Sequence, residues 1–226
     1  MKVNNAKTKL LCISDALSFE ARSFILDEQG ERLESSEEMK LLGFHLSTRP
    51  NVTAHVQALL KRLRIRLWII RHLREAGFNK EELVRVYKIV VRPVHDYLCV
   101  VYHPMLTEDQ DERLERIQSQ ALKSIFGWRI AYAELRRLAD VPTLRDRRVE
   151  LCDSFASKNL VGQFSHWFPL RDSGPGTRRS ARGTEKYLEL FARCDRLRRS
   201  PLFYMRRRLN GKPGREMGVR NLAQAR

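Results

Sequence analysis

Two consecutive segments, MKLLGFHLS (Met39–Ser47) and HVQALLKRLRIRLWIIRHLREAGFNKEELVRVYKIVVRPVHDYLCVVYHPML (His55–Leu106), establish the pattern of this chain. The first alternates apolar and polar residues, which predicts a short β-strand, and Gly43 within it indicates a bulge or a close approach of another backbone. The second repeats aliphatic residues at spacings of three and four and is rich in arginine, which predicts two basic amphipathic helices. The expected fold class is therefore α+β, mainly α, with a small N-terminal β element.

Capping signals mark where these two helices begin and end. Gly77 is placed to end the first helix, and Asn79 with Glu82 three residues later forms a capping-box pattern at the start of the second. Pro93 lacks a backbone N–H, so we expect it to kink or split the second helix. The core expected between the helices contains Leu60, Leu63, Leu67, Trp68, Val86, Val90, Tyr97, Leu114, Ile117 and Ile125.

The rest of the chain divides into a helical part and a basic tail. Thr107 with Gln110 forms a second capping box and predicts a helix that ends before Gly127. A short helix is expected over 132–138, and Thr143 is placed to cap a last long helix. The domains expected are a β region (1–50), a helical domain (51–160) and a basic, aromatic-containing, partly disordered tail (161–226) with a linker at 172–183.

The net charge of +16, with a pI near 10.2, favours a polyanionic partner, first RNA or DNA and then an anionic membrane surface. Residues 161–226 hold 16 Lys/Arg against 5 Asp/Glu. No apolar stretch approaches a membrane span or a signal peptide, so we expect no membrane association and an intracellular protein, in the nucleus, the cytoplasm or both. The four cysteines are far apart, which predicts reduced, buried thiols and no metal site.

A self-contained active site is not recognisable. Nucleotidyl transfer needs paired acids that hold two magnesium ions, and the chain contains no adjacent Asp-Asp. It also lacks a glycine-rich phosphate loop, a Gly-x-Ser-x-Gly elbow and a His-Glu-x-x-His motif. We therefore predict no catalytic residue, no metal ligand and no cofactor in this chain.

Six short motifs occur in the order of a known family. Each is weak alone, and together they cover about residues 3–160. They are Asn4-Asn5-Ala6-Lys7-Thr8, Lys40-Leu41-Leu42-Gly43-Phe44, Leu73-Arg74 with Gly77-Phe78, Arg92-Pro93-Val94 with Asp96-Tyr97, Leu114-Glu115-Arg116-Ile117-Gln118 with Ala121-Leu122 and Ile125, and Thr143-Leu144 with Arg147-Arg148. On these motifs the chain resembles the C-terminal part of a reverse transcriptase from a non-LTR (LINE-type, jockey-like or CR1-like) retrotransposon: the end of the palm, the primer-grip hairpin and the thumb.

The resemblance implies a part of an enzyme. The family's catalytic Tyr/Phe-x-Asp-Asp strand would precede residue 1, so the chain would not polymerise DNA alone, and the complete enzyme would need magnesium. The implied partners are an RNA template with a DNA primer, or an RNA–DNA hybrid, and the missing palm and fingers. Leu42, Gly43 and Phe44 would form the hairpin near the primer end. Lys7 would lie on the side of the departing pyrophosphate, although an ordinary solvated lysine is the alternative.

Basic residues provide the candidate nucleic-acid contacts. On the first helix they are Lys61, Arg62, Arg64 and Arg66, which would follow the phosphate backbone. In the tail they are Arg196, Arg198, Arg199, Arg206, Arg207 and Arg208, which with Phe203 and Tyr204 would bind single-stranded RNA. The alternatives are a solvated helix face and a disordered tail or localisation signal. At the level of the whole chain, the alternatives are a stand-alone basic nucleic-acid-binding module and a helical interaction domain.

Overall fold

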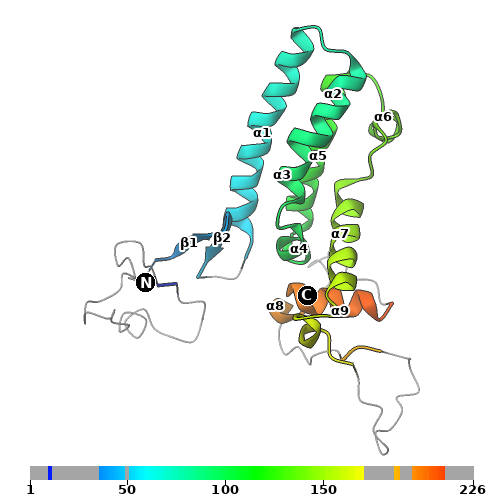
Figure 1. The fold of residues 1–226 in the computed structure, drawn as a ribbon. Coiled ribbons are helices and arrows are strands. Elements are labelled where there is room, and N and C mark those ends of the chain that lie inside the picture. Colours follow the sequence, from blue (N-terminus) through cyan, green and yellow to red (C-terminus); the bar gives the residue numbers. More distant parts are fainter. Residues whose placement is uncertain (1–9, 12–35, 49–50, 171–185, 189–194, 212–226) are drawn as a thin grey trace, which may run out of the picture. The chain divides into compact units, whose positions relative to one another are not determined.

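The computed structural model describes residues 10–11, 36–48, 51–170, 186–188 and 195–211, of which the side chains of residues 195 and 196 are excepted (Figure 1). The described part is mainly helical with one small antiparallel hairpin near its N-terminal end, which confirms the expected fold class. The chain forms two compact units, Met1–Ala58 and Leu59–Arg226. The boundary between these units lies within the first helix, and the expected domains 1–50, 51–160 and 161–226 stay a prediction.

The hairpin belongs to the first unit. Its strands are β1 (Glu38–Leu41) and β2 (Phe44–Ser47), with Leu41 opposite Phe44. Leu42 and Gly43 connect them with positive φ angles of 49° and 87°, as a two-residue hairpin turn requires. The interpretation of 39–47 as one strand is therefore wrong, because the chain reverses at Leu42 and Gly43, whereas the N-terminal β-hairpin expected from the resemblance is present.

The helices of the second unit begin with α1 (Thr53–Glu75), which crosses the boundary between the units. After α1 the chain turns back and forms a second helix, which is interrupted and consists of α2 (Lys80–Val86), the π-helix η3 (Tyr87–Val91) and α3 (Arg92–Asp96). This second helix runs antiparallel to α1 and lies beside α1 and α5 (Glu108–Phe126) (Figure 1). The remaining elements are α4 (Cys99–Tyr102), η4 (His103–Met105), α6 (Tyr132–Ala139), α7 (Leu144–Lys158), η5 (Ser165–Trp167), α8 (Asp195–Arg198) and α9 (Pro201–Leu209).

Local hydrogen bonds set the turn between α1 and α2. Gly77 has φ 90°, and the N–H of Phe78 donates to the carbonyl of Leu73 at 3.1 Å, which is the Schellman pattern of a helix end. The Asn79 side chain accepts from the Glu82 N–H at 2.9 Å, and the Glu82 carboxylate accepts from the Asn79 N–H at 2.9 Å. Both boundary predictions are confirmed.

Pro93 divides the second helix as expected. It lies in the first turn of α3, where a missing N–H is tolerated, and the π-helical turn η3 directly precedes it. The wider π-helical turn changes the register of the helix. The buried residues are consequently Leu83, Tyr87, Val91 and His95, whereas the expected Val86 and Val90 are only half-buried.

The expected core is confirmed at most positions. Leu60, Leu63, Leu67, Leu114, Ile117 and Ile125 are all buried. Trp68 and Tyr97 contradict the prediction, with 57% and 51% of their surfaces exposed. Trp68 follows Leu67 directly, and one residue turns a helix by about 100°, which places its side chain outside the apolar stripe.

A substitution at Leu63 tests this packing. Leu63→Ala is expected to lower the free energy of unfolding by about 3 kcal/mol, because the side chain is buried and its removal leaves a cavity. Ile65→Ala, at a position 62% exposed on the same helix, is the matched control and should change stability by less than about 0.5 kcal/mol. Urea denaturation measures both, and equal effects would contradict the assignment of the two faces.

The caps of α5 and α7 also match the sequence prediction. Thr107 and Gln110 exchange the capping-box hydrogen bonds, and Gly127, with φ 121°, follows the end of α5. The Thr143 hydroxyl accepts from the Asp146 N–H at 2.9 Å. Cys99 and Cys152 are buried, free thiols, as expected, and burial raises the pKa of Cys99 to about 12. The other two cysteines lie outside the described residues.

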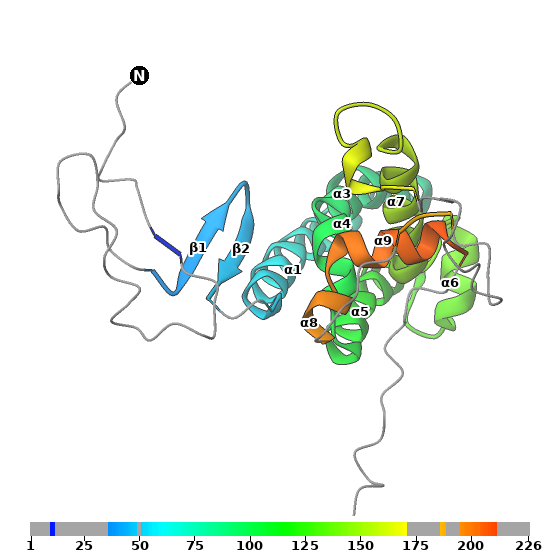
Figure 2. The ribbon, with the colours of Figure 1, turned by 90° about the horizontal axis from the view of Figure 1, so that it is seen from below.

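The C-terminal segment folds onto the helical core. Helix α9 lies across α4 and α7 (Figure 2), and Tyr204 and Met205 pack with Cys152, Ala156 and Phe168. The expectation of a separate basic tail is therefore wrong for residues 201–209, because this helix has an apolar face that the core covers. The expected linker at 172–183 lies outside the described residues. Within the described part, no helix is long and apolar enough to cross a membrane.

Candidate nucleic-acid interface

One face of α1 carries exposed cations around an exposed aromatic ring. Lys61, Arg64, Trp68 and Arg71 recur at spacings of three or four, Ile65 lies beside Arg64, and all five are exposed. Between Thr53 and Arg74 the helix contains six Lys/Arg and no acid. Within the described part of the chain, no carboxylate pairs with Lys61, Arg64 or Arg71. We call these five residues the α1 basic face, and its positive charge is available to an external anion.

Two of the other α1 cations, Arg66 and Arg74, bind the helix to its neighbours. Arg66 is half-buried and donates from Nε to the carbonyl of Val90 at 3.0 Å. Arg74 donates from Nη1 to the carbonyl of Ser124 at 2.8 Å. Arg62 is half-buried, and its carbonyl accepts from Arg66 at 3.4 Å. The structure therefore separates the four predicted contacts: Lys61 and Arg64 face solvent, and Arg66 supports the helix.

Trp68 is held in place by a neighbour one turn later. The centroids of its ring and of the His72 ring are 3.8 Å apart, and the ring planes are inclined by 39°. The His72 Nδ1 lies 3.0 Å from the carbonyl of Trp68, which restrains the imidazole. An exposed, restrained indole between arginines is a suitable surface for stacking. Sequence reasoning assigned Trp68 to the core and did not include Arg71 among the nucleic-acid contacts. The spacing of three or four between residues 61, 64, 68 and 71, away from the apolar stripe, was the signal that could have placed both on the exposed face.

The predicted hairpin residues lie together at one turn. Leu42 is 79% exposed at the tip of the hairpin, Gly43 completes the turn, and Phe44 begins β2. The centroids of the Phe44 and His55 rings are 4.5 Å apart, and both residues belong to the same unit. The tip of the hairpin exposes the aliphatic side chain of Leu42, and the contact between the Phe44 and His55 rings holds the start of β2 in place. Lys7 lies outside the described residues.

The predicted C-terminal contacts are mostly engaged within the chain. Phe203 and Tyr204 are buried, and the Tyr204 hydroxyl lies 3.1 Å from His103 Nε2, so stacking of bases on these rings is excluded in this structure. Arg206 is buried and donates to the carbonyl of Trp167 at 2.8 Å, and burial lowers the pKa of its guanidinium. Arg208 pairs with Asp153. Arg207 is half-buried, Arg198 and Arg199 are exposed, and the side chain of Arg196 is outside the described residues.

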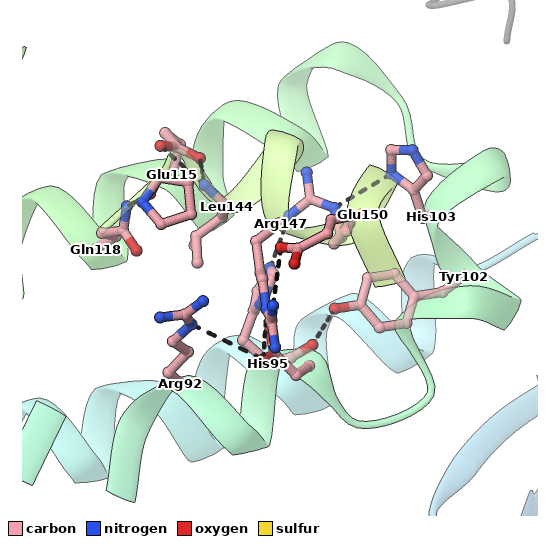
Figure 3. Close-up of polar contacts among 12 residues, drawn as sticks. Arg92, His95, Tyr102, His103, Glu115, Gln118, Leu144, Arg147 and Glu150 are labelled. Carbon is pink, nitrogen blue, oxygen red and sulfur yellow. Dashed lines mark hydrogen bonds and ion pairs between the residues drawn. The ribbon is translucent and has the colours of Figure 1, made fainter. Parts of the chain in front are cut away.

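A buried guanidinium at the centre of the helical unit escaped sequence reasoning. Arg148 is fully buried and pairs with Asp111 of α5. It donates from Nη1 to His95 Nε2 at 2.7 Å and from Nε to His103 Nδ1 at 3.2 Å. Figure 3 labels His95 and His103, the two histidines that this guanidinium contacts. Arg148, Asp111, His95 and His103 are called the Arg148 cluster below.

The Arg148 cluster requires neutral imidazoles. A ring nitrogen that accepts from a guanidinium carries no proton, so each histidine holds its proton on the other nitrogen. For His95 that nitrogen, Nδ1, lies 3.4 Å from Asp96, and for His103 it is Nε2, which lies 3.1 Å from the Tyr204 hydroxyl. Burial, with the charge of Arg148 as a further cause, lowers the pKa of both histidines to about 4. No sequence pattern joins these residues, because they lie on separate helices.

The motif residues Glu115 and Gln118 act as ties between helices. The Glu115 carboxylate accepts from the N–H of Leu144 at 3.0 Å, and Gln118 donates to the carbonyl of Pro142 at 2.9 Å (Figure 3). The Tyr132 hydroxyl donates to Glu115 at 2.5 Å, and the Tyr87 hydroxyl donates to Gln118. Both residues therefore hold the start of α7 against α5.

Comparison with known proteins gives no independent identification. No family model, no curated protein and no solved structure matches the chain. Among the described residues, no three His, Cys, Asp or Glu side chains gather as a metal site would require. The surface that best suits a ligand in the described part of the chain is the α1 basic face, together with the surfaces that adjoin it.

Proposed function

We propose that the helical unit binds nucleic acid through the α1 basic face. The observation that carries this proposal is the row of exposed cations, Lys61, Arg64 and Arg71, around the exposed ring of Trp68. Cations at these positions contact phosphates, and the indole adds a stacking or sugar contact that an isolated charge does not offer. Hydrogen bonds from Arg66 and Arg74 to neighbouring helices hold α1, and with it these exposed residues, in position.

The family resemblance gives this binding a context. On that basis the chain is a part of an RNA-directed DNA polymerase of a non-LTR retrotransposon, acting inside the cell, and its preferred ligand is the hybrid of RNA template and DNA primer. The helical unit then acts as a thumb, and the hairpin tip at Leu42, Gly43 and Phe44 approaches the primer end. The chain contributes binding; catalysis and magnesium belong to the palm and fingers of the complete enzyme.

The arrangement of the cations supports recognition of the phosphate backbone without base readout. The exposed residues at 61, 64, 68 and 71 lie along about 15 Å of helix, at a rise of 1.5 Å per residue. A face of this length spans several phosphates of one strand. Because each contact releases counterions, affinity should fall steeply as salt is raised, with little dependence on sequence.

Arg64→Ala tests the proposal directly. We expect it to weaken binding of an RNA–DNA hybrid several-fold and to reduce the slope of log K against log salt by about one, because one phosphate contact is lost. Arg137→Ala, which removes an exposed guanidinium from α6, is the matched control and should leave the slope unchanged. Fluorescence anisotropy over a salt series measures both. Equal slopes for Arg64→Ala and the unmodified chain would overturn the assignment.

A second candidate, a protein-interaction module, rests on a different surface. Ile89, Pro93, Tyr97 and Val101 recur every four residues along the interrupted helix and are exposed. An apolar row of this kind fits a protein partner, of which the palm of a complete polymerase is one example. Absence of hybrid binding at low salt would favour this candidate over the nucleic-acid interface.

A further inference from the structure

Trp128 is a second exposed indole, in the turn that follows α5. It is 60% exposed and borders an open groove of about 360 Å³ whose other lining residues are Arg71, Arg74, Glu75 and Ser124. The Lys123 ammonium lies 5.9 Å from the centroid of the Trp128 ring. The groove thus combines an aromatic surface with two arginines and one carboxylate, and Lys123 lies beside the aromatic ring.

This groove continues the α1 basic face. Arg71 belongs to both, so a strand that follows Lys61, Arg64 and Arg71 along α1 arrives at Trp128. Arg74 separates the groove from a second one of about 720 Å³, which Phe78 and Lys80 also line. Both grooves therefore contain arginine or lysine side chains beside an aromatic ring, together with one glutamate each.

We propose that the Trp128 groove binds one unpaired nucleotide of the nucleic acid held on α1, with its base stacked on Trp128 and its phosphate on Arg71; this inference rests on the proposed function. A paired base inside a duplex is stacked on both faces by its neighbours and cannot place a full face on the indole, whereas a base of a single-stranded extension can enter the groove and do so. The preferred ligand is an RNA–DNA hybrid that ends in a single-stranded extension.

The chemistry of the groove limits the alternatives. A purely anionic ligand such as inorganic phosphate would use the cations and leave the indole without a role. A purely apolar ligand would leave the cations without one. The Glu75 carboxylate accepts hydrogen bonds and repels a second phosphate, which suits the amino group of a base or a sugar hydroxyl beside it. A nucleotide satisfies all three kinds of group.

The test compares two probes and two variants. The probes are a blunt RNA–DNA hybrid and the same hybrid with a single-stranded extension that carries 2-aminopurine at its first unpaired position. The variants of the full chain are Trp128→Ala and Trp128→Phe. Because Trp128 is largely exposed, both variants should keep the thermal stability of the unmodified chain, which a melting curve verifies.

We expect the unmodified chain to bind the extended hybrid about tenfold more tightly than the blunt one, the gain that one stacked base provides. Trp128→Ala should lose this gain and the quenching of 2-aminopurine, and Trp128→Phe should retain part of both. Equal affinities of the unmodified chain for the two probes, or unchanged quenching in Trp128→Ala, would overturn the proposal. If the blunt hybrid binds with a strong salt dependence and the extension adds nothing, only this inference fails. If neither probe binds, the proposed function fails with it.

Discussion

Arg148→Met is expected to lower the free energy of unfolding by about 3–5 kcal/mol, because removal of one member of a buried ion pair leaves the Asp111 carboxylate with only the partly exposed Arg145 as a charged partner. Arg148 is fully buried and Asp111 almost so, and two imidazoles also lose their hydrogen-bond donor in this variant. Methionine keeps most of the volume, so the loss reports the polar contacts more than a cavity. Urea denaturation of the full chain at pH 7 measures it.

Arg145→Met is the matched control for this prediction. Arg145 also pairs with Asp111, at 2.5 Å, but its side chain is 41% exposed, so water replaces much of the lost contact. We expect a loss below about 1 kcal/mol, as for other exposed ion pairs. Adding Asp111→Asn to Arg148→Met should restore part of the stability, since it removes a carboxylate whose buried partner has been lost. Similar losses in the two single variants would show that burial does not set the strength of these pairs.

The Arg148 cluster also explains how short, interrupted helices form one unit. It joins α3, η4, α5 and α7, and the contact between His103 and Tyr204 extends it to α9. The positions of these elements depend on one guanidinium, whose five donors have a fixed geometry that lysine does not reproduce. Arg66 and Arg74 then hold α1 against this frame. The exposed cations of α1 are thus positioned by a set of buried ones.

Sequence reasoning succeeded where the deciding interactions are local. Gly77, the pair Asn79 and Glu82, and Pro93 act within a few residues, so their effects could be read from spacing alone. The buried stripe of α1 was predicted for the same reason. The α1 cations were identified as a group, but their separation into exposed and supporting members depends on which carbonyl lies opposite each of them, and that is a property of the packed unit.

Most failures involve contacts between distant segments or changes of helical register, and the turn at Gly43 and the position of Trp68 are the exceptions. Trp68 follows Leu67 by one residue, so its place outside the apolar stripe of α1 could be read from the helical spacing. The π-helical turn η3 rotated the buried side of the second helix and left Tyr97 exposed. Residues 201–209 have the composition of a basic tail, yet the face that carries Tyr204 and Met205 packs on α7. Arg148 looked like one of many surface arginines, because its partners lie tens of residues away in sequence.

Stability is expected to fall steeply between pH 6.5 and pH 4, because His95 and His103 are neutral in the folded protein. Their pKa is lowered to about 4 by burial, with Arg148 as a further cause, whereas unfolded histidine titrates near 6.5. In this window the unfolded chain binds more protons than the folded one, so acidification favours unfolding. A difference of 2.5 pKa units corresponds to about 3 kcal/mol for each histidine. The charged or titratable groups that face the two rings are Asp96, Asp111, Arg145, Arg148 and Tyr204.

Replacing one of the two histidines measures how much that residue contributes to the pH dependence of stability. His103→Gln keeps an acceptor for Arg148 but removes the titration, so the loss of stability between pH 6.5 and pH 4 should shrink by about half. His166→Gln, at an exposed histidine, is the matched control and should leave the slope intact. Urea denaturation at pH 7, 5.5 and 4.5 measures the three proteins. A slope in His103→Gln equal to that of the unmodified chain would mean that His103 is not held neutral by Arg148, and the guanidinium would then need another acceptor in the folded state.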